Sequence, residues 1–349
     1  MNVHVNTSRP YDVVIREGLL EACAPMISPY VQGRTAAVVT DDNVAPLYFQ
    51  TLTGQLKACG CRVVCYEIPN GEASKTLETY GRLLVWLSQQ GLTRGDCVIA
   101  LGGGVVGDLA GFAAATYLRG IAYVQVPTTL LAAVDSSVGG KTAVDLPTGK
   151  NLAGAFYPPA LVLCDPLTLR TLPAQVFADG MAEVIKYGMI CDAPLLALLE
   201  RGMQGQQSAI IGRCVAIKRD IVSRDERETG ERKLLNFGHT VAHAVEKCSN
   251  YTVSHGRAVG IGMAVLTRSW EKRGLCPPEC TDVLLRLLGQ YGLDDTCRYD
   301  AAALCAAMGA DKKRDGDSID LIVPTGLGKT AICRTPVAQL PGIVAAGLA

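Results

Sequence analysis

Short runs rich in β-forming residues alternate with longer helical stretches throughout the first half of the chain. The β-rich runs cover residues 11–15, 35–40, 61–68, 97–101, 122–126 and 161–164. Several of them are apolar at successive positions, as expected for strands that are buried on both faces of a sheet. Stretches with helical spacing, such as 77–89 and 109–117, lie between them. This alternation predicts an α/β domain with a largely parallel sheet.

The pattern changes after about residue 165. Helical spacing dominates residues 175–189, 207–224, 240–247, 260–273 and 281–290, and a strand-like run returns at 319–323. Prolines at 158 and 159, and again after Asp165, mark a hinge. We therefore predict two domains, an α/β domain over residues 1–165 and an all-α domain over residues 166–349.

The composition of the chain limits the classes of partner that the protein is expected to bind. The chain has 349 residues, nearly half of them apolar, and 33 basic residues balance 33 acidic residues. This balance predicts no binding to nucleic acid or to an acidic membrane surface. Uninterrupted apolar runs stay well short of the ~18 residues of a membrane span. The 14 cysteines are scattered without CxxC spacing and no signal peptide is evident, so we expect reduced thiols in a cytoplasmic protein.

A glycine-rich segment follows the predicted strand at 97–101. Residues 102–107 satisfy the GxGxxG pattern, which lets the backbone approach a pyrophosphate at the start of a helix. The acidic residue that the Rossmann fingerprint places ~20 positions further on is missing, and Asp108 follows at once instead. The segment therefore predicts either a variant, Rossmann-like nucleotide site or an ordinary tight turn from strand to helix.

Further charged residues occupy glycine-rich loops and helix faces. Lys141 and Lys150 carry compact charges suited to phosphate or carboxylate, although both could lie in solvated turns. Glu183 and Lys186 share one helix face at i and i+3, and their apolar neighbours favour a buried pair over an exposed one. Other cations flank Asn236, and two lysines form a basic pair near position 312. Either group could instead lie on the solvated surface without a binding role.

The histidines form a cluster. Only four are present, and His239, His243 and His255 fall within one short window. His239 and His243 share a helix face at i and i+4, whereas His255 would have to reach the same site from a loop. A catalytic zinc site uses three protein ligands, and Glu183 could complete a set with two histidines. Spacing alone selects His239 and His243 as the metal ligands.

Nine short segments together resemble the 3-dehydroquinate synthase family of sugar phosphate cyclases. They cover residues 70–75, 102–108, 117–120, 127–130, 135–141, 149–151, 183–186, 236–243 and 255–256. The resemblance implies an NAD-binding α/β domain followed by a helical metal- and substrate-binding domain. It also implies a carbon–oxygen lyase of the shikimate pathway, which leads to chorismate and the aromatic amino acids. The substrate would be a phosphorylated sugar acid, 3-deoxy-D-arabino-heptulosonate 7-phosphate, and the products 3-dehydroquinate and phosphate.

The same resemblance implies two cofactors. NAD would be reduced and reoxidised within one turnover that comprises oxidation at C5, β-elimination of phosphate, re-reduction, ring opening and aldol closure. One divalent metal, zinc or alternatively cobalt, would be bound by Glu183, His239 and His255. His243 would then transfer protons, which reverses the choice made from spacing.

The remaining site residues also follow from the resemblance. Asp135, Lys141, Lys186 and Asn236 would be catalytic together with His243. Substrate would be held by Asn151, Lys218, Arg232, Lys312 or Lys313, and by Arg119 of a neighbouring subunit in a homodimer. NAD would contact Asp42, Glu72, Lys75, Gly104, Val105, Val106, Gly107, Asp108, Thr128, Thr129, Lys141, Lys150, Thr168, Leu169, Arg170 and Thr171.

Three alternatives stay open at this point. A metal- and NAD-dependent polyol or glycerol-phosphate dehydrogenase of similar architecture would leave Lys218 and Arg232 without a carboxylate to bind. Another sugar phosphate cyclase would act on a heptulose that lacks the carboxylate. A nucleotide-binding module without catalytic activity would not need the histidine cluster.

Overall fold

The computed structural model describes residues 1–308, 314–315 and 317–348 of the chain. It divides into two compact units. Unit 1 comprises Met1–Leu172 and Lys218–Glu226, and unit 2 comprises Pro173–Ile217 and Arg227–Ala349. The structure thus adds a later segment to the first unit, where the sequence prediction used a single boundary. Within the described residues, no helix is both long and apolar enough to span a bilayer.

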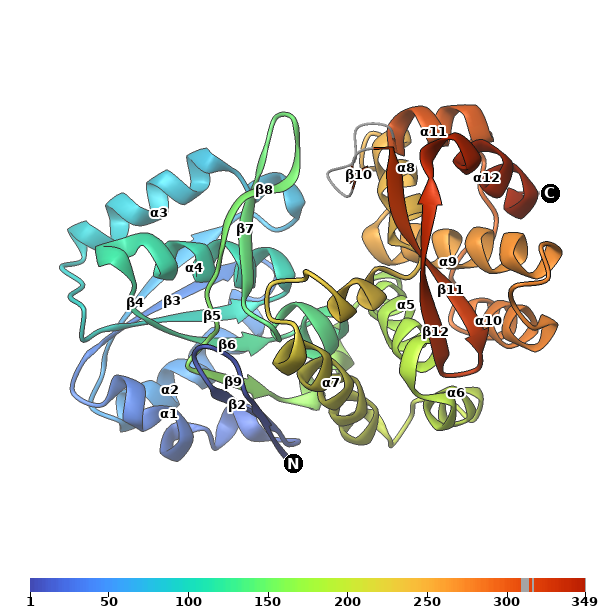
Figure 1. The fold of residues 1–349 in the computed structure, drawn as a ribbon. Coiled ribbons are helices and arrows are strands. Elements are labelled where there is room, and N and C mark those ends of the chain that lie inside the picture. Colours follow the sequence, from blue (N-terminus) through green and yellow to red (C-terminus); the bar gives the residue numbers. More distant parts are fainter. Residues whose placement is uncertain (309–313, 316, 349) are drawn as a thin grey trace. The chain divides into compact units, whose positions relative to one another are not determined.

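Unit 1 is built around a mostly parallel sheet (Figure 1). The pairs are parallel except for the antiparallel edge pair β1–β2. This confirms the α/β prediction, and the six predicted strands lie at the expected positions within one residue at each end. In spatial order the strands are β1 (Asn2–Val5), β2 (Tyr11–Ile15), β9 (Leu161–Cys164), β6 (Ala122–Pro127), β5 (Cys97–Gly102), β3 (Thr35–Asp41) and β4 (Arg62–Ile68).

Helices cover both faces of this sheet, which explains the continuous apolar runs. In β3, Ala36 and Val38 pack on one face with α1 (Ala24–Val31) and α2 (Gln50–Ala58). Ala37 and Val39 pack on the other face with α3 (Leu77–Gln89) and α4 (Gly104–Thr116). Successive side chains point to opposite faces, so each must be apolar when both faces are buried.

The two glycine-rich loops predicted around Lys141 and Lys150 are strands. β7 (Lys141–Leu146) and β8 (Gly149–Phe156) form an antiparallel hairpin with Lys141 opposite Phe156. Their glycines and polar residues hid the strand pattern, because the hairpin leaves many of its positions partly exposed. The hairpin contacts α3 and α4 and carries several of the predicted binding residues.

Unit 2 is mainly helical, as predicted, and a small antiparallel sheet accompanies the helices (Figure 1). The sheet order is β10 (Arg314–Asp315), β11 (Ser318–Gly326) and β12 (Lys329–Pro336), and β11 contains the predicted run 319–323. The helices are α5 (Ala174–Cys191), α6 (Ala193–Glu200), α8 (His239–Cys248), α9 (His255–Lys272), α10 (Pro278–Gln290), α11 (Ala301–Met308) and α12 (Leu340–Leu348), while α7 (Gln207–Arg224) extends across the boundary between the units in sequence.

We expect Gly262→Ala to destabilise unit 2. A Cβ atom at Gly262 of α9 would lie 2.1 Å from the carbonyl oxygen of Gly238, at the start of α8, where only backbone could yield. Forced overpacking of this kind costs about 1–3 kcal/mol, so the thermal midpoint should fall by several degrees. Gly289→Ala in α10 is the matched control, because a Cβ there meets nothing within 4 Å. Equal melting of the two variants would contradict the prediction.

Candidate active site

Most residues expected to bind NAD follow the carboxyl ends of parallel strands. Asp42 follows β3, Glu72 and Lys75 follow β4, the segment 104–108 follows β5, Thr128 and Thr129 follow β6, and the segment 168–171 follows β9. Carboxyl ends of parallel strands meet at one edge of a sheet, which is where open α/β sheets bind ligands. The chain order also reverses here, because β3 lies between β4 and β5. The fold therefore brings these segments to one edge.

Lys75 is the centre of a buried polar cluster in unit 1. Its Nζ lies 2.5 Å from Oδ2 of Asp108, the residue that ends the glycine-rich segment. It also donates to Oδ1 of Asn151 at 2.6 Å and lies 3.8 Å from Glu72. Burial opposes the charge on the ammonium, but the carboxylates of Asp108 and Glu72 outweigh burial and hold the pKa of Lys75 above its ordinary value. The lysine is therefore a cation that joins β4, α4 and the hairpin.

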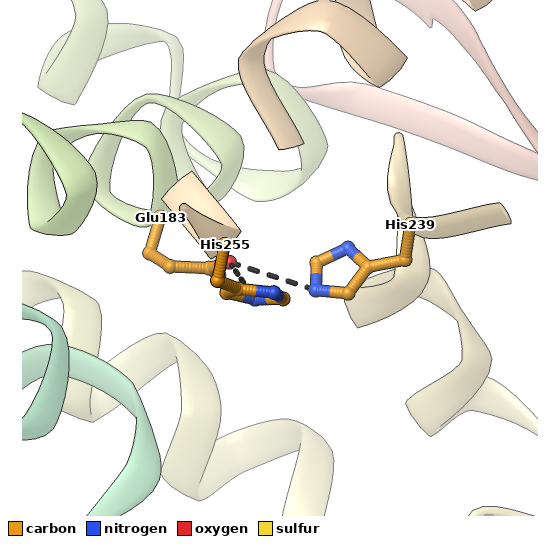
Figure 2. A group of neighbouring side chains, drawn as sticks. All are labelled: Glu183, His239 and His255. Atoms are coloured by element: carbon orange, nitrogen blue, oxygen red, sulfur yellow. Dashed lines mark ion pairs between the residues drawn. The ribbon is translucent and has the colours of Figure 1, made fainter. Parts of the chain in front are cut away.

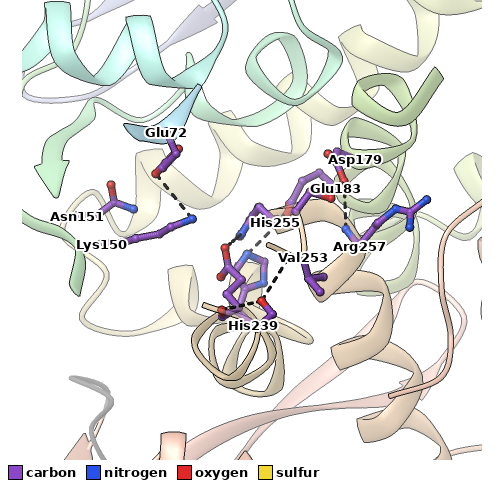
Figure 3. Close-up of polar contacts among 12 residues, drawn as sticks. Glu72, Lys150, Asn151, Asp179, Glu183, His239, Val253, His255 and Arg257 are labelled. Atoms are coloured by element: carbon purple, nitrogen blue, oxygen red, sulfur yellow. Dashed lines mark hydrogen bonds and ion pairs between the residues drawn. The ribbon is translucent and has the colours of Figure 1, made fainter. Parts of the chain in front are cut away.

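Asn151 is held in a left-handed conformation, with φ at 54°, on β8. Its backbone N–H donates to Oδ1 of Asp145 at 2.8 Å, and the N–H of Asp145 donates to the carbonyl of Lys75 at 2.8 Å. Lys150 lies beside it, with Nζ 3.8 Å from Oε1 of Glu72 (Figure 3). Asp145 is not among the residues predicted from the sequence, since nothing in its local pattern distinguishes it from a solvated turn residue.

A second buried cation of unit 1 is Lys218. Its Nζ donates to the carbonyl oxygen of Asp135 at 2.7 Å and lies 3.0 Å from the Asp135 carboxylate. Lys218 is only 6% exposed, which excludes the solvated helix end that the sequence left open. Two predicted site residues that are distant in sequence are thus in contact.

The turn expected to bind NAD after β9 is fixed by hydrogen bonds within unit 1. Asp165 caps the short helix Pro166–Thr171 by accepting from the N–H of Leu167. The hydroxyl of Tyr48 lies 2.6 Å from that of Thr171 and donates to the carbonyl of Thr168. At the end of β3, hydrogen bonds from Asn70 lower the pKa of Asp42.

The histidine cluster of unit 2 converges on one carboxylate (Figure 2). Nε2 of His239 and Nε2 of His255 each lie 3.5 Å from Oε1 of Glu183. Ligand atoms of these three residues lie within 4.8 Å of one another, and this is the one such group among the described residues. Two ligands bound ~2.1 Å from a tetrahedral zinc are about 3.4 Å apart, so the donor set and its spacing fit zinc.

Each ligand atom of this group has a neighbour that fixes its role. Lys186 forms an ion pair with Oε2 of Glu183, which leaves Oε1 toward the imidazoles. Nδ1 of His239 lies 3.1 Å from the carbonyl of Phe237, so a proton there leaves Nε2 as the donor to a metal. Burial lowers the pKa of His255, but the carboxylates of Glu183 and Glu246 outweigh it and raise the pKa to about 10. The group therefore favours positive charge.

His243 is near the group without belonging to it. Its ring centroid lies 5.8 Å from that of His239, and the ring of His255 is closer to His239, at 5.3 Å. His255 is the first residue of α9, so it reaches the group from a helix start and not from the expected loop. The geometry brings together the ligands implied by the resemblance and not the pair chosen from spacing.

Other predicted residues of unit 2 are enclosed. Arg232 is 1% exposed and Lys186 is 2% exposed, which excludes a solvated surface for both. Nδ2 of Asn236 donates to Oε1 of Glu228 at 2.5 Å. Buried cations need charged or polar partners, and the carboxylate of Glu183 is one such partner for Lys186.

Arg119 and the basic pair at 312–313 are the remaining residues predicted to bind substrate. Arg119 is exposed, and both it and Leu118 adopt positive φ values of 66° and 50°. Consecutive non-glycine residues in this region are strained by about 1–3 kcal/mol each, and such strain is concentrated at functional sites. Lys312 and Lys313 lie outside the described residues.

Comparison with known families places the chain among the NAD- and metal-dependent carbocycle-forming enzymes. Residues 65–179 match the model for the N-terminal part of 3-dehydroquinate synthase, and residues 180–314 match the model for its C-terminal part. A Streptococcus suis protein named 3-dehydroquinate synthase is 41% identical over 97% of this chain and 98% of its own length. A Clostridium kluyveri protein of the same name is 43% identical over 96% of each. The chain therefore belongs to the 3-dehydroquinate synthase family.

Solved structures agree with this assignment. A 2-deoxy-scyllo-inosose synthase complexed with carbaglucose-6-phosphate, NAD+ and Co2+ superposes with a TM-score of 0.89, at 26% identity over 99% of each chain. A 2-epi-5-epi-valiolone synthase from Streptomyces hygroscopicus with NAD+ and Zn2+ bound also reaches 0.89, at 27% identity over 99% of this chain and 98% of that one. An iron-containing alcohol dehydrogenase reaches 0.70 at 16% identity, which shows a shared fold alone.

These comparisons confirm the family, the fold class and the enzyme class predicted from the sequence. The matches named 3-dehydroquinate synthase cover nearly the whole chain at over 40% identity, whereas the dehydrogenase match is much more distant. The dehydrogenase alternative and the alternative cyclase therefore fit less well than 3-dehydroquinate synthase, a lyase of the shikimate pathway.

Proposed function

We propose that the chain converts 3-deoxy-D-arabino-heptulosonate 7-phosphate into 3-dehydroquinate and phosphate, using NAD as a catalytic cofactor and one divalent metal. The observation that carries this proposal is the convergence of Glu183, His239 and His255 in a chain whose residues 65–314 match the two models of the family. Both related cyclases described above contain NAD+ and a divalent metal, Co2+ in one and Zn2+ in the other.

The NAD site would use the carboxyl edge of the unit 1 sheet. The N–H groups at the start of α4, from Gly104 onward, would receive the pyrophosphate. Asp42, Glu72 and Lys150 would lie around the ribose and nicotinamide, and the Thr168–Thr171 turn would contact the remainder. Lys75 would hold Asp108 and Asn151 in place, since it contacts both.

The metal would be held by Glu183, His239 and His255, and it would act as a Lewis acid on the substrate hydroxyls. A set of two imidazoles and one carboxylate leaves coordination positions for those hydroxyls. Lys186 would keep the second oxygen of Glu183 occupied, and His243 would move protons to and from substrate oxygen. NAD would supply hydride transfer at C5.

Cations and amides among the predicted residues would bind the substrate. In unit 1, Lys141 and Asn151 would bind the phosphate, and Asp135 and Lys218 would contact the hydroxyls and the carboxylate. In unit 2, Arg232 would bind the carboxylate and Asn236 a hydroxyl. Lys312 or Lys313, and Arg119 from a partner subunit, would add to the phosphate site. A cationic pocket of this kind stabilises charge on the departing phosphate.

We further propose a cytoplasmic homodimer. All 14 cysteines lie in the described part of the chain and none is joined in a disulfide, which suits a reducing compartment. The strained and exposed Arg119 supports the dimer, because a residue that serves a partner's site must project from the surface. Sedimentation of wild type and Arg119→Ala, together with their turnover, would test this role.

A single assay tests the proposed reaction. Purified enzyme with zinc and substoichiometric NAD should release phosphate from the heptulosonate phosphate until the substrate is consumed, without accumulating NADH. A heptulose phosphate that lacks the carboxylate should react far more slowly, because it would lack the contacts that Lys218 and Arg232 would make to that group. Continued NADH formation from glycerol or another polyol would overturn the proposal in favour of a dehydrogenase. Faster reaction of the substrate without a carboxylate would favour a different cyclase.

A further inference from the structure

His255 is the member of the metal group that its surroundings enclose least. Its side chain is 35% exposed, compared with 12% for His239 and 1% for Glu183. It is also the first residue of α9, so its position depends on where that helix begins. Contacts from outside the group must therefore hold both its ring and its backbone.

Glu246 lies at the ring nitrogen of His255 that does not face Glu183. Its Oε1 is 3.6 Å from Nδ1 of His255, and its side chain is only 4% exposed. Glu246 lies on α8 among buried apolar neighbours such as Val245, and a buried carboxylate there is costly unless a donor or a cation faces it. A proton on Nδ1 of His255 would face the Glu246 carboxylate and leave the Nε2 lone pair toward Glu183.

Asp179 lies at the backbone start of the same helix. Its Oδ1 accepts from the hydroxyl of Ser254 at 2.6 Å and from the N–H of Arg257 at 3.2 Å (Figure 3). Ser254 is the residue that precedes α9, so a carboxylate from α5 performs the capping that a helix usually receives from its own N-cap side chain. A negative charge is also favourable beside a helix N-terminus.

Close backbone contact joins this cap to the metal group. A Cβ atom on Gly256 would lie 2.2 Å from Cα of Asp179, so α5 and α9 touch where only glycine fits. Asp179 and Glu183 are one turn apart on α5 and share a face. One face of α5 therefore supplies a metal-group carboxylate and also sets the start of the helix that bears His255.

We propose that Glu246 and Asp179 are positioning residues for His255 as a metal ligand, Glu246 through the ring and Asp179 through the start of α9. The inference rests on the proposed metal site and deepens it. Outer-shell partners of metal ligands typically contribute about 10–100-fold to metal affinity. Glu246 stands three positions after His243 and directly before Lys247, so the sequence alone does not distinguish it from a solvated helix residue.

The test measures zinc affinity of the apoprotein by competition with a chromophoric chelator. Glu246→Leu removes the acceptor at Nδ1 and should weaken zinc binding by about 10–100-fold. Glu246→Gln keeps an acceptor oxygen and should lose less zinc affinity than Glu246→Leu. Asp179→Asn should also weaken binding, because it removes the negative charge that stabilises the N-terminus of α9. The visible absorption of Co2+-loaded protein should change in the Glu246 variants, since it reports the ligand geometry.

Asp192→Asn is the matched control. Asp192 directly follows α5, caps α6 by accepting from the N–H of Leu195 at 3.1 Å, and pairs with Arg213 at 2.7 Å. This variant should lower the thermal midpoint but keep the zinc affinity of wild type. If Asp179 had only a structural role, Asp179→Asn and Asp192→Asn would have the same zinc affinity.

The outcomes separate this inference from the proposed function. If wild type binds zinc and the Glu246 and Asp179 variants bind it equally well, the positioning role is overturned and the metal site stands. If the wild-type apoprotein binds no zinc, the proposed metal site fails and the inference fails with it. A graded loss from Gln to Leu at position 246, with normal binding by Asp192→Asn, supports the inference.

Discussion

His255→Ala should lose bound zinc, whereas His243→Ala should keep zinc and lose turnover. Nε2 of His255 lies 3.5 Å from Oε1 of Glu183, within the three-residue metal group, and His243 lies outside it. Removing one of three ligands should reduce the zinc content of the purified protein to near zero. Loss of a general acid or base costs about 10²–10⁴-fold in turnover, so the His243 variant should fall by that factor. Metal analysis and phosphate release measure the two effects.

The fourth histidine provides the control for this experiment. His4 is an exposed residue of β1 that pairs with Asp12 at 2.8 Å, and His4→Ala should change neither zinc content nor turnover. If His243→Ala lost zinc while His255→Ala retained it, the histidine ligands would be His239 and His243. That result would contradict the group formed by Glu183, His239 and His255.

Lys75→Met should destabilise unit 1 and weaken NAD binding. The variant leaves Asp108 without its ammonium partner at 2.5 Å and removes the donor to Asn151. Breaking a buried ion pair costs about 3–5 kcal/mol, and the low end applies because the Asp108 side chain retains 18% exposure. A loss of about 1.4 kcal/mol of binding free energy lowers affinity tenfold. We therefore expect the affinity for NAD to fall by about tenfold or more. Thermal melting and fluorescence titration with NAD measure the two changes.

Arg82→Met is the matched control in the same unit. Arg82 and Glu78 form an i,i+4 pair at 3.6 Å on α3, with side chains 65% and 79% exposed. Exposed pairs contribute about 0–1 kcal/mol, so this variant should melt close to wild type and bind NAD normally. Comparable losses in the two variants would show that Lys75 has no special role in the cluster.

The local elements were largely predictable because their signals are local. Strand runs such as 36–39 and 97–101 are apolar at every position since both faces of the sheet are covered, and this pattern is visible without any structure. Helical spacing in the second half is equally local. The hairpin β7–β8 was not predictable, because its strands are stabilised by pairing with each other and not by an apolar pattern.

The sequence by itself determined the element order, the family and the residue types available for metal, nucleotide and phosphate chemistry. Periodicity also placed Glu183 and Lys186 on one face, which the structure confirms as a buried pair. These conclusions depend on neighbours within one or two helical turns, or on motifs that keep their spacing.

Only the tertiary structure decided which side chains meet. It brought His255 to Glu183 while His243 stayed outside the group, although spacing favoured His243. It also buried Lys218 and Arg232, paired Lys75 with Asp108, and set Asp179 and Glu246 beside His255. The physical reason is that each contact joins different helices or strands. Its formation depends on how apolar faces pack and how closely backbones approach, and no local period records that.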